Sequence, residues 1–298
     1  MKNKNIYLWI SDAGKDTGEG QLANKYLENL IKNKYTFKII KKSNNNLIKI
    51  LLEFRYIIPF IGIFFCWKFF LQNKKVGYIN YLPFWNFLIF LLLPPKTLLG
   101  PITGGANFNN DNFLIRKYIF PIFYKISETI VNLRSYNLLF STELLKKYLS
   151  KKTKKKSTFN FIIKQFSYKI KKKKDIDFLI YYRNHKNKKS FFPYNLINNL
   201  LLLKFKVHIV GDKLNLRSVT NYNFINNKKL GNLQSRARFT VISNENLYSL
   251  FTLESIAQNV KVLINKSVRT RIVYFKKSFL KINFNNLKEL NKLKKIYK

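Results

Sequence analysis

The sequence is poor in cysteine and histidine, and each shortage excludes a class of protein. A single cysteine, Cys66, among 298 residues excludes a disulfide framework and a cysteine-based zinc cluster. Two histidines, His185 and His208, are too few for a histidine-rich metal site. We therefore expect no metal centre in this chain.

Acidic residues are also scarce: 14 stand against 56 lysines and arginines, which gives a net charge of +42. Such an excess usually indicates a nucleic-acid binder. Here, however, lysine is spread over the whole chain together with asparagine and isoleucine, as in proteins from A/T-rich genomes. No zinc-finger spacing, basic-zipper heptad or RNP-type aromatic signature accompanies it. We expect no nucleic-acid partner and favour peripheral contact with an anionic membrane, because aromatic patches accompany the charge.

Long hydrophobic runs are missing as well. The two longest apolar stretches, 57–67 and 82–93, have about half of the roughly 20 residues that a spanning helix needs. We expect them to be buried helices or a patch that dips into one leaflet. No cleavable signal peptide follows Met1, so the sequence predicts a cytoplasmic location, compatible with the inner face of the cell membrane.

What the sequence does contain is apolar material for two cores: 47% of its residues are hydrophobic and 16% aromatic. Short apolar runs alternate with stretches of helical periodicity, such as 21–32, and the alternation restarts after the lysine-rich stretch 151–174. This predicts two α/β domains with parallel sheets, at 1–160 and 161–280, and a basic C-terminal helix in 281–298. The predicted strands are 6–10, 37–40, 77–80, 97–99, 137–140, 177–182, 206–210, 239–242 and 260–264.

The strongest candidate site lies in 243–264, where a strand is followed by a loop carrying Glu245 and then by a helix. The first amides of that helix, around Ser249, Leu250 and Phe251, are unpaired and lie at the positive end of its dipole. A phosphate bound there would leave Glu254, one turn further, to accept hydrogen bonds from a ribose diol. The alternative is a plain strand–helix–strand unit with two acidic residues near its turn.

A basic loop, 181–190, directly follows another predicted strand. Arg183 and Lys188 are five residues apart in this loop and would neutralise a diphosphate leaving group from two sides. In a chain this rich in lysine, the arginine is the more informative of the two. A basic loop by itself indicates little.

Two glycine-containing segments follow strands in the first half. Residues 12–21, which include Gly18, Glu19 and Gly20, fit neither the dinucleotide-binding glycine pattern nor the P-loop. They do fit a loop at the carboxyl end of a strand, where open α/β sheets bind ligands. Gly104 and Gly105 should lie on the same rim.

Taken in order, these motifs resemble glycosyltransferases of the GT-B fold, in particular the "glycosyl transferases group 1" family. Arg183 and Lys188 match that family's Gly-Arg…Lys-Gly pair, and 254–257 with 262–264 match the second half of its E-x7-E donor signature. Residues 18–20 and 100–105 resemble its two glycine turns. One departure is that eight residues, not seven, separate Glu245 from Glu254, which puts Asn246 at the strict position.

The resemblance implies two Rossmann-like domains that face each other across a cleft. It further implies transfer of a hexose from a nucleoside-diphosphate sugar to a glycan or lipid-linked acceptor in cell-surface polysaccharide biosynthesis, with retention of configuration and without a metal or a resident cofactor.

The same resemblance implies roles for the candidate residues. Arg183 and Lys188 would stabilise the departing diphosphate, helped by the amides of Ser249, Leu250 and Phe251; Glu254 would bind the ribose, and Glu245 or Asn246 the transferred sugar. The first domain would bind the acceptor through Gly18, Glu19, Gly20, Gly104 and Gly105. A non-catalytic basic α/β protein that binds an anionic membrane surface or nucleic acid remains the alternative.

Overall fold

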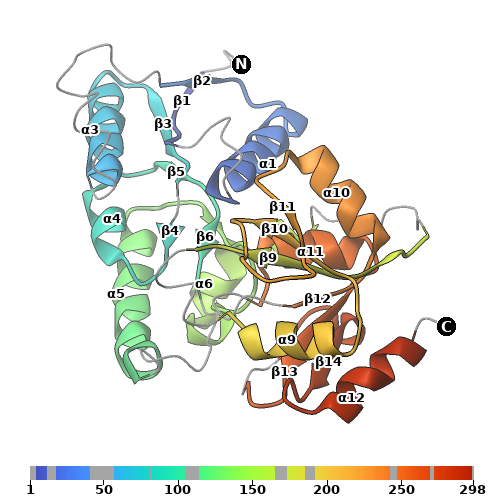
Figure 1. The fold of residues 1–298 in the computed structure, drawn as a ribbon. Coiled ribbons are helices and arrows are strands. Elements are labelled where there is room, and N and C mark those ends of the chain that lie inside the picture. Colours follow the sequence, from blue (N-terminus) through green and yellow to red (C-terminus); the bar gives the residue numbers. More distant parts are fainter. Residues whose placement is uncertain are drawn as a thin grey trace. The chain divides into compact units, whose positions relative to one another are not determined.

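The computed structural model describes residues 5–11, 18–40, 57–80, 82–104, 114–164, 173–184, 192–241, 247–268 and 272–296. These residues form two compact units, one containing the described residues up to 164 and the other those from 173 onward (Figure 1). Each unit has its own parallel sheet and its own hydrophobic core.

The first unit is built on four parallel strands in the order β2-β1-β3-β5. The strands are β1 (Ile6–Trp9), β2 (Phe37–Ile39), β3 (Lys75–Tyr78) and β5 (Leu98–Leu99). Parallel neighbours cannot be joined by a tight turn, and helices make the connections. The helices are α1 (Gly18–Lys32), α3 (Ile58–Leu71) and α4 (Phe87–Leu92).

The apolar stretch 57–67 lies in helix α3 and its N-cap, and the stretch 82–93 contains a short strand at 82–83 and then helix α4; each helix has one side in the core. Gly62 lets α3 approach β1 closely, since a Cβ there would lie 2.3 Å from Nε1 of the buried Trp9. Each stretch thus contains a helix with one side in the core, as expected for a buried helix, while the other side of each helix is exposed. Among the described residues, no helix is long and apolar enough to cross a membrane.

The rest of the first unit extends this core with elements that, apart from the strand near 137–140, the sequence pattern does not indicate. These are two small parallel sheets, one of β4 (Leu82–Pro83) with β6 (Ile102–Thr103) and one of β7 (Leu138–Leu139) with β8 (Ser157–Thr158), and the helical segments η1 (Ile115–Ile119), α5 (Phe120–Leu133), η2 (Lys146–Tyr148), α6 (Lys151–Lys156) and α7 (Phe161–Lys164). Between β7 and α6, the chain forms only the short turn η2. The lysine-rich 151–156 is helical because the Ser150 side chain accepts the N–H of Thr153 and caps it.

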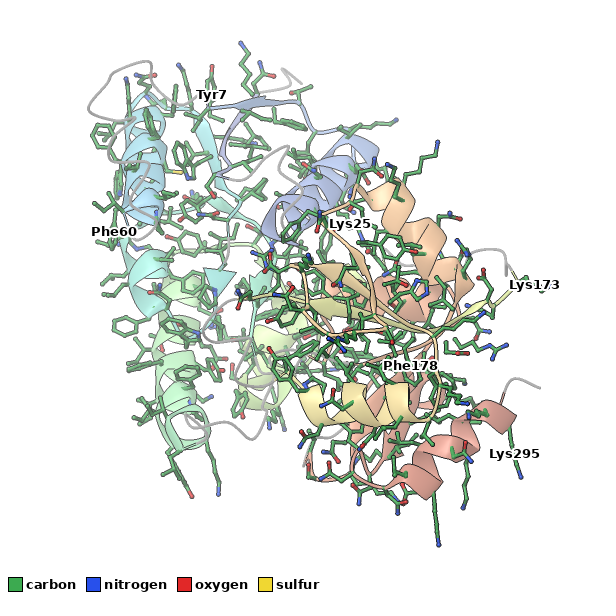
Figure 2. The ribbon with its side chains drawn as sticks, viewed as in Figure 1. Tyr7, Lys25, Phe60, Lys173, Phe178 and Lys295 are labelled. Carbon is green, nitrogen blue, oxygen red and sulfur yellow. The ribbon has the colours of Figure 1, made fainter. Side chains whose placement is uncertain are left out.

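The second unit has six parallel strands in the order β11-β10-β9-β12-β13-β14. The strands are β9 (Ile176–Tyr182), β10 (Val207–Gly211), β11 (Thr220–Tyr222), β12 (Ala237–Val241), β13 (Lys261–Asn265) and β14 (Phe279–Ile282). The helical segments are α9 (Tyr194–Leu202), α10 (Asn227–Arg236), α11 (Leu250–Ala257), η3 (Lys276–Ser278), α12 (Leu287–Lys292) and η4 (Leu293–Lys295). Phe178 lies at the centre of the core (Figure 2).

The four strands predicted in the second half are confirmed to within two residues. The edge strands β11 and β14 and the helix α10 were not predicted. In sequence α10 is polar and contains Gly231, so its helical signal is weak. The C-terminal helix α12 packs on the core of this unit through Leu290, and Leu293 of η4 joins it there.

Glu128 is a buried carboxylate in α5 that ties this helix to the start of α6. Its Oε1 accepts the N–H of Ser150 at 2.7 Å, and its Oε2 lies 3.1 Å from Nζ of Lys125. Burial acts to raise the pKa of Glu128, but hydrogen bonds from Thr153, Ser150 and Lys125 outweigh it, so the pKa lies below the usual value. The charged form of Glu128 therefore stabilises the first unit.

We predict that Glu128→Gln destabilises the first unit at neutral pH by about 1–3 kcal/mol, because it removes a charged acceptor from buried donors. Because the pKa of Glu128 is lowered by folding, its contribution to stability is fully present above the pKa of the unfolded state, about 4.3. The contribution is lost as the pH falls through the pKa of the folded state. The difference in thermal unfolding midpoint between the variant and the wild type should be largest near pH 7 and should disappear in acid. Glu28→Gln, at an exposed position of α1, is the control. An equal gap at every pH would contradict the prediction.

Candidate functional site

The strand order of the second unit reverses beside β9. The chain runs outward from β9 to β10 and β11, then returns to place β12 on the other side of β9 (Figure 1). Open α/β sheets bind ligands at the carboxyl ends of the strands where the order reverses. Arg183 directly follows β9, and the helix after β12 is α11, so the predicted site residues fall at this place.

Three side chains hold the guanidinium of Arg183. Its Cζ lies 4.8 Å from the centre of the Phe224 ring, its Nη1 donates to the hydroxyl of Tyr181 at 3.3 Å, and its Nε lies 3.6 Å from Oδ2 of Asp212. Among the described residues, none accepts a hydrogen bond from its Nη2. The side chain is 40% exposed, so it is oriented by the protein while one donor group remains open to an anion.

Asp212 is placed by the close approach of the ends of β9 and β10. Its Oδ2 accepts the N–H of Asn184 at 2.6 Å, and its own N–H donates to the carbonyl of Tyr182 at 3.0 Å. Gly211 makes this approach possible, because its φ is +111° and a Cβ there would lie 2.2 Å from the Tyr182 carbonyl oxygen.

The first turn of α11 packs against the same end of β9. Ser249 is the N-cap and accepts the N–H of Thr252 at 3.2 Å, which leaves the N–H groups of Leu250 and Phe251 without partners inside the helix. The Phe251 ring stacks on Tyr181 at 5.5 Å, the residue that also binds Arg183. The open amides and the arginine are thereby linked through one pair of rings.

Two buried side chains hold α11 in position. Gln234 of α10 donates from Nε2 to the carbonyl of Phe251 and to Oγ of Ser255, each at 3.2 Å. The hydroxyl of Tyr248, just before the helix, accepts the N–H groups of Val273 and Tyr274. Burial raises the pKa of Tyr248, so its hydroxyl stays neutral at physiological pH.

The structure brings five of the predicted residues to one edge of the second sheet: Arg183, Ser249, Leu250, Phe251 and Glu254. Glu254 is half-buried, one turn into α11. The predicted Lys188, Glu245 and Asn246 lie outside the described residues.

Three further residues of this edge were not among the predicted site residues. Asp212 follows a strand and is one of few acids, which was a usable signal. Tyr181 and Phe224 had none, because the chain contains 18 tyrosines and 28 phenylalanines.

In the first unit, the strand order reverses between β1 and β3, where the Ser11 hydroxyl donates to Oδ1 of Asn80. Helix α1 begins at Gly18 instead of residue 21, so Gly18, Glu19 and Gly20 form its first turn and the prediction of a loop there is wrong. Helix ends are the least certain part of a pattern-based prediction. Gly104 follows β6 with φ +132°, a conformation that favours glycine, and Gly105 lies outside the described residues.

In the part of the chain that the structure describes, no group of three or more histidine, cysteine, aspartate or glutamate side chains is arranged to hold a metal ion.

No protein-family model matches this sequence, and no curated protein matches it. Solved structures do match, over nearly the whole chain. The Methanocaldococcus jannaschii UDP-GlcNAc 2-epimerase, in complex with UDP-GlcNAc and UDP, has a TM-score of 0.53 at 10% identity, with 98% of this chain and 91% of that chain covered.

Two further structures are similar to the same extent. Anabaena HepE, in complex with UDP and glucose, has a TM-score of 0.51 at 9% identity, covering 99% of this chain and 90% of that one. An alpha-glucosyltransferase, in complex with UDP and a 13-mer DNA containing an HMU base, has a TM-score of 0.50 at 11% identity, with the same coverage.

The two parallel α/β sheets and these similarities define the fold class as GT-B, with two Rossmann-like domains. The fold class predicted from the sequence is confirmed. The resemblance to the group 1 family within that class stays a prediction.

We predict that Gly211→Ala destabilises the second unit by more than about 1 kcal/mol, because the new Cβ meets the Tyr182 carbonyl and the residue has a positive φ. Gly231→Ala in α10 is the matched control: its Cβ would meet nothing within 4 Å, and helix propensity favours alanine by about 1 kcal/mol. Thermal unfolding should show a lower midpoint for Gly211→Ala and an equal or higher one for Gly231→Ala. Equal midpoints for the two variants would contradict the packing at residue 211.

Proposed function

We propose that this protein is a glycosyltransferase that moves a hexose from a nucleoside-diphosphate sugar, bound by the second domain, to an acceptor bound by the first. One observation carries the proposal: an oriented arginine, Arg183, adjoins the open N-terminus of α11 where the strand order reverses. Both groups suit an anion, and the Tyr181–Phe251 stack links the segments that carry them. A diphosphate has the two phosphates that such a pair would bind.

In the proposed reaction, the bond between the anomeric carbon and the β-phosphate oxygen breaks, the acceptor hydroxyl oxygen forms the new bond to that carbon, and the hydroxyl proton passes to the departing diphosphate. Negative charge grows on the leaving diphosphate. Arg183, through Nη2, and the amides of Leu250 and Phe251 would stabilise that charge, which is the main catalytic contribution that we assign to the protein. Lys188 would add a second cation, in place of a metal ion.

Asp212, Tyr181 and Phe224 act as positioning residues in this proposal. Each contacts a different part of the Arg183 guanidinium, and together they select one rotamer of a long side chain. Holding it before the donor arrives lowers the entropy cost of binding.

The remaining roles follow the resemblance. Glu254 would accept hydrogen bonds from the ribose diol, and Glu245 or Asn246 would bind the transferred sugar, with retention of configuration. The acceptor would be a glycan or a lipid-linked saccharide in cell-surface polysaccharide biosynthesis, bound near Gly104 and the start of α1. The same fold also occurs in an epimerase, so product analysis must distinguish transfer from epimerisation.

The first test is calorimetric titration with UDP, GDP and ADP. We predict that Arg183→Ala weakens binding of the preferred diphosphate by about 10- to 100-fold, because a charge-assisted hydrogen bond contributes about 1.5–3 kcal/mol. Arg217→Ala removes the same charge from an exposed position of the same domain and should leave the affinity unchanged.

Equal losses in the two variants would mean that the net charge, and not a site, binds the nucleotide. Incubation with the matching sugar nucleotide then separates the activities. Free nucleoside diphosphate and a glycosylated acceptor would indicate transfer. An intact sugar nucleotide whose sugar has the opposite configuration at one carbon would indicate epimerisation and contradict the proposal.

A second prediction concerns Glu254. Wild-type protein should bind UDP about tenfold or more tightly than 2′-deoxy-UDP, because the deoxy compound lacks one of the hydroxyls that the carboxylate accepts from. Glu254→Ala should bind both compounds with the same, weaker affinity. Retained discrimination in this variant would show that another residue binds the ribose.

A further inference from the structure

One face of α5 and of η1 before it carries a stripe of exposed isoleucines. Ile115, Ile119, Ile122 and Ile126 follow one another at spacings of three or four residues, which places them on one side of a helix. Their exposed fractions are between 38% and 60%. The opposite side, with Tyr124 and Val131, is buried in the core. The stripe is therefore not needed for packing within the described part of the first unit.

The stripe continues onto two neighbouring helices. Phe87 of α4 contacts Phe123 of α5 at 5.5 Å, and Nε1 of Trp67 in α3 donates to the carbonyl of Leu92 in α4 at 2.7 Å. Figure 1 shows α3, α4 and α5 one after another along one side of the first unit.

Both of these helices present apolar side chains of their own. Leu88 and Leu91 of α4 are exposed, and so are Phe60 and Phe64 of α3; Phe60 is labelled at the outer edge in Figure 2. We call the exposed faces of α3, of α4 and of α5, together with η1, which runs directly into α5, the three-helix surface. Contiguous apolar areas of this kind mark interaction sites.

The charge of the three-helix surface is entirely positive. Lys68 lies four residues after Phe64 on the exposed side of α3, Lys117 lies over the ring of Tyr118, and Lys125 borders Ile122 and Ile126. The one acidic residue in these helices, Glu128, is buried and hydrogen-bonded. In the sequence, only Asp111 is acidic between residues 54 and 127. An occupant of this surface must therefore be apolar and anionic.

We propose that the three-helix surface binds the interface of an anionic lipid bilayer. Apolar side chains flanked by lysines on a helix that is too short to span are the features of an interfacial helix. The lysines match acidic headgroups, while the isoleucine, leucine and phenylalanine side chains enter the boundary of the acyl chains. A second copy of this chain is a poor occupant, because it carries the same charge of +42. This inference goes beyond the proposed function and does not depend on it.

The test is sedimentation of the full chain with vesicles, without nucleotide. Wild-type protein should bind phosphatidylcholine vesicles that contain phosphatidylglycerol and bind vesicles of phosphatidylcholine alone much more weakly. The triple variant Ile119→Gln, Ile122→Gln, Ile126→Gln should lower the partition coefficient on the anionic vesicles by at least about tenfold, since each side chain loses apolar contact with the acyl region. These positions are exposed, so thermal unfolding should be unchanged.

The matched control is Ile31→Gln with Leu202→Gln. These two side chains are 61% and 73% exposed on α1 and α9, outside the three-helix surface, and their replacement should leave vesicle binding as in wild type. Equal binding by all three proteins would overturn the proposal, because the net charge alone would then hold the protein on the vesicle. Absence of wild-type binding would overturn it too and would point to an acidic protein partner. Calorimetry with the nucleotide should give wild-type affinity for the triple variant, which keeps this test separate from that of the proposed function.

Discussion

The candidate site depends on how closely the carboxyl ends of β9 and β10 approach each other. Residue 211 tolerates this approach only as glycine, because a Cβ would lie 2.2 Å from the carbonyl oxygen of Tyr182. With that contact in place, Asp212 bonds to the backbone on both sides of Arg183 and reaches its guanidinium. A wider separation would leave the arginine free to rotate in solvent. The ion pair between Asp212 and Arg183 thus depends on this close packing of the backbone.

The ion pairs of this protein show which charged side chains have a structural or functional role. In a chain of +42, lysines far outnumber acids, and several of the described acids join separate elements. In the second unit, Asp175 pairs with Arg236 and Asp177 with Arg238, which joins β9 to α10 and β12. Such partly exposed pairs contribute little to stability. The Asp212–Arg183 pair differs because it lies at the carboxyl edge, where it orients a donor group instead of only joining elements.

Much of the fold followed from local patterns. Runs such as 178–182 and 262–264 are apolar because inner parallel strands are buried on both faces, so their sequences indicate their place. Edge strands carry no such signal: β11 and β14 are short and include exposed residues, and they are strands because a neighbour offers hydrogen bonds. Helix α5 was not predicted. Its two sides differ in burial, but the exposed side carries isoleucines as well, so residue type alone does not distinguish them.

The sequence by itself determined the class of fold, its division into two α/β units and the segments that supply Arg183 and the first turn of α11, because these depend on periodicity and on residue type. Only the tertiary structure decided that Tyr181, Phe224 and Asp212 surround that arginine, because they come from three separate segments that parallel pairing brings together. It likewise decided which apolar side chains remain exposed. Composition counts an isoleucine of the core and one of the three-helix surface alike, and only packing distinguishes them.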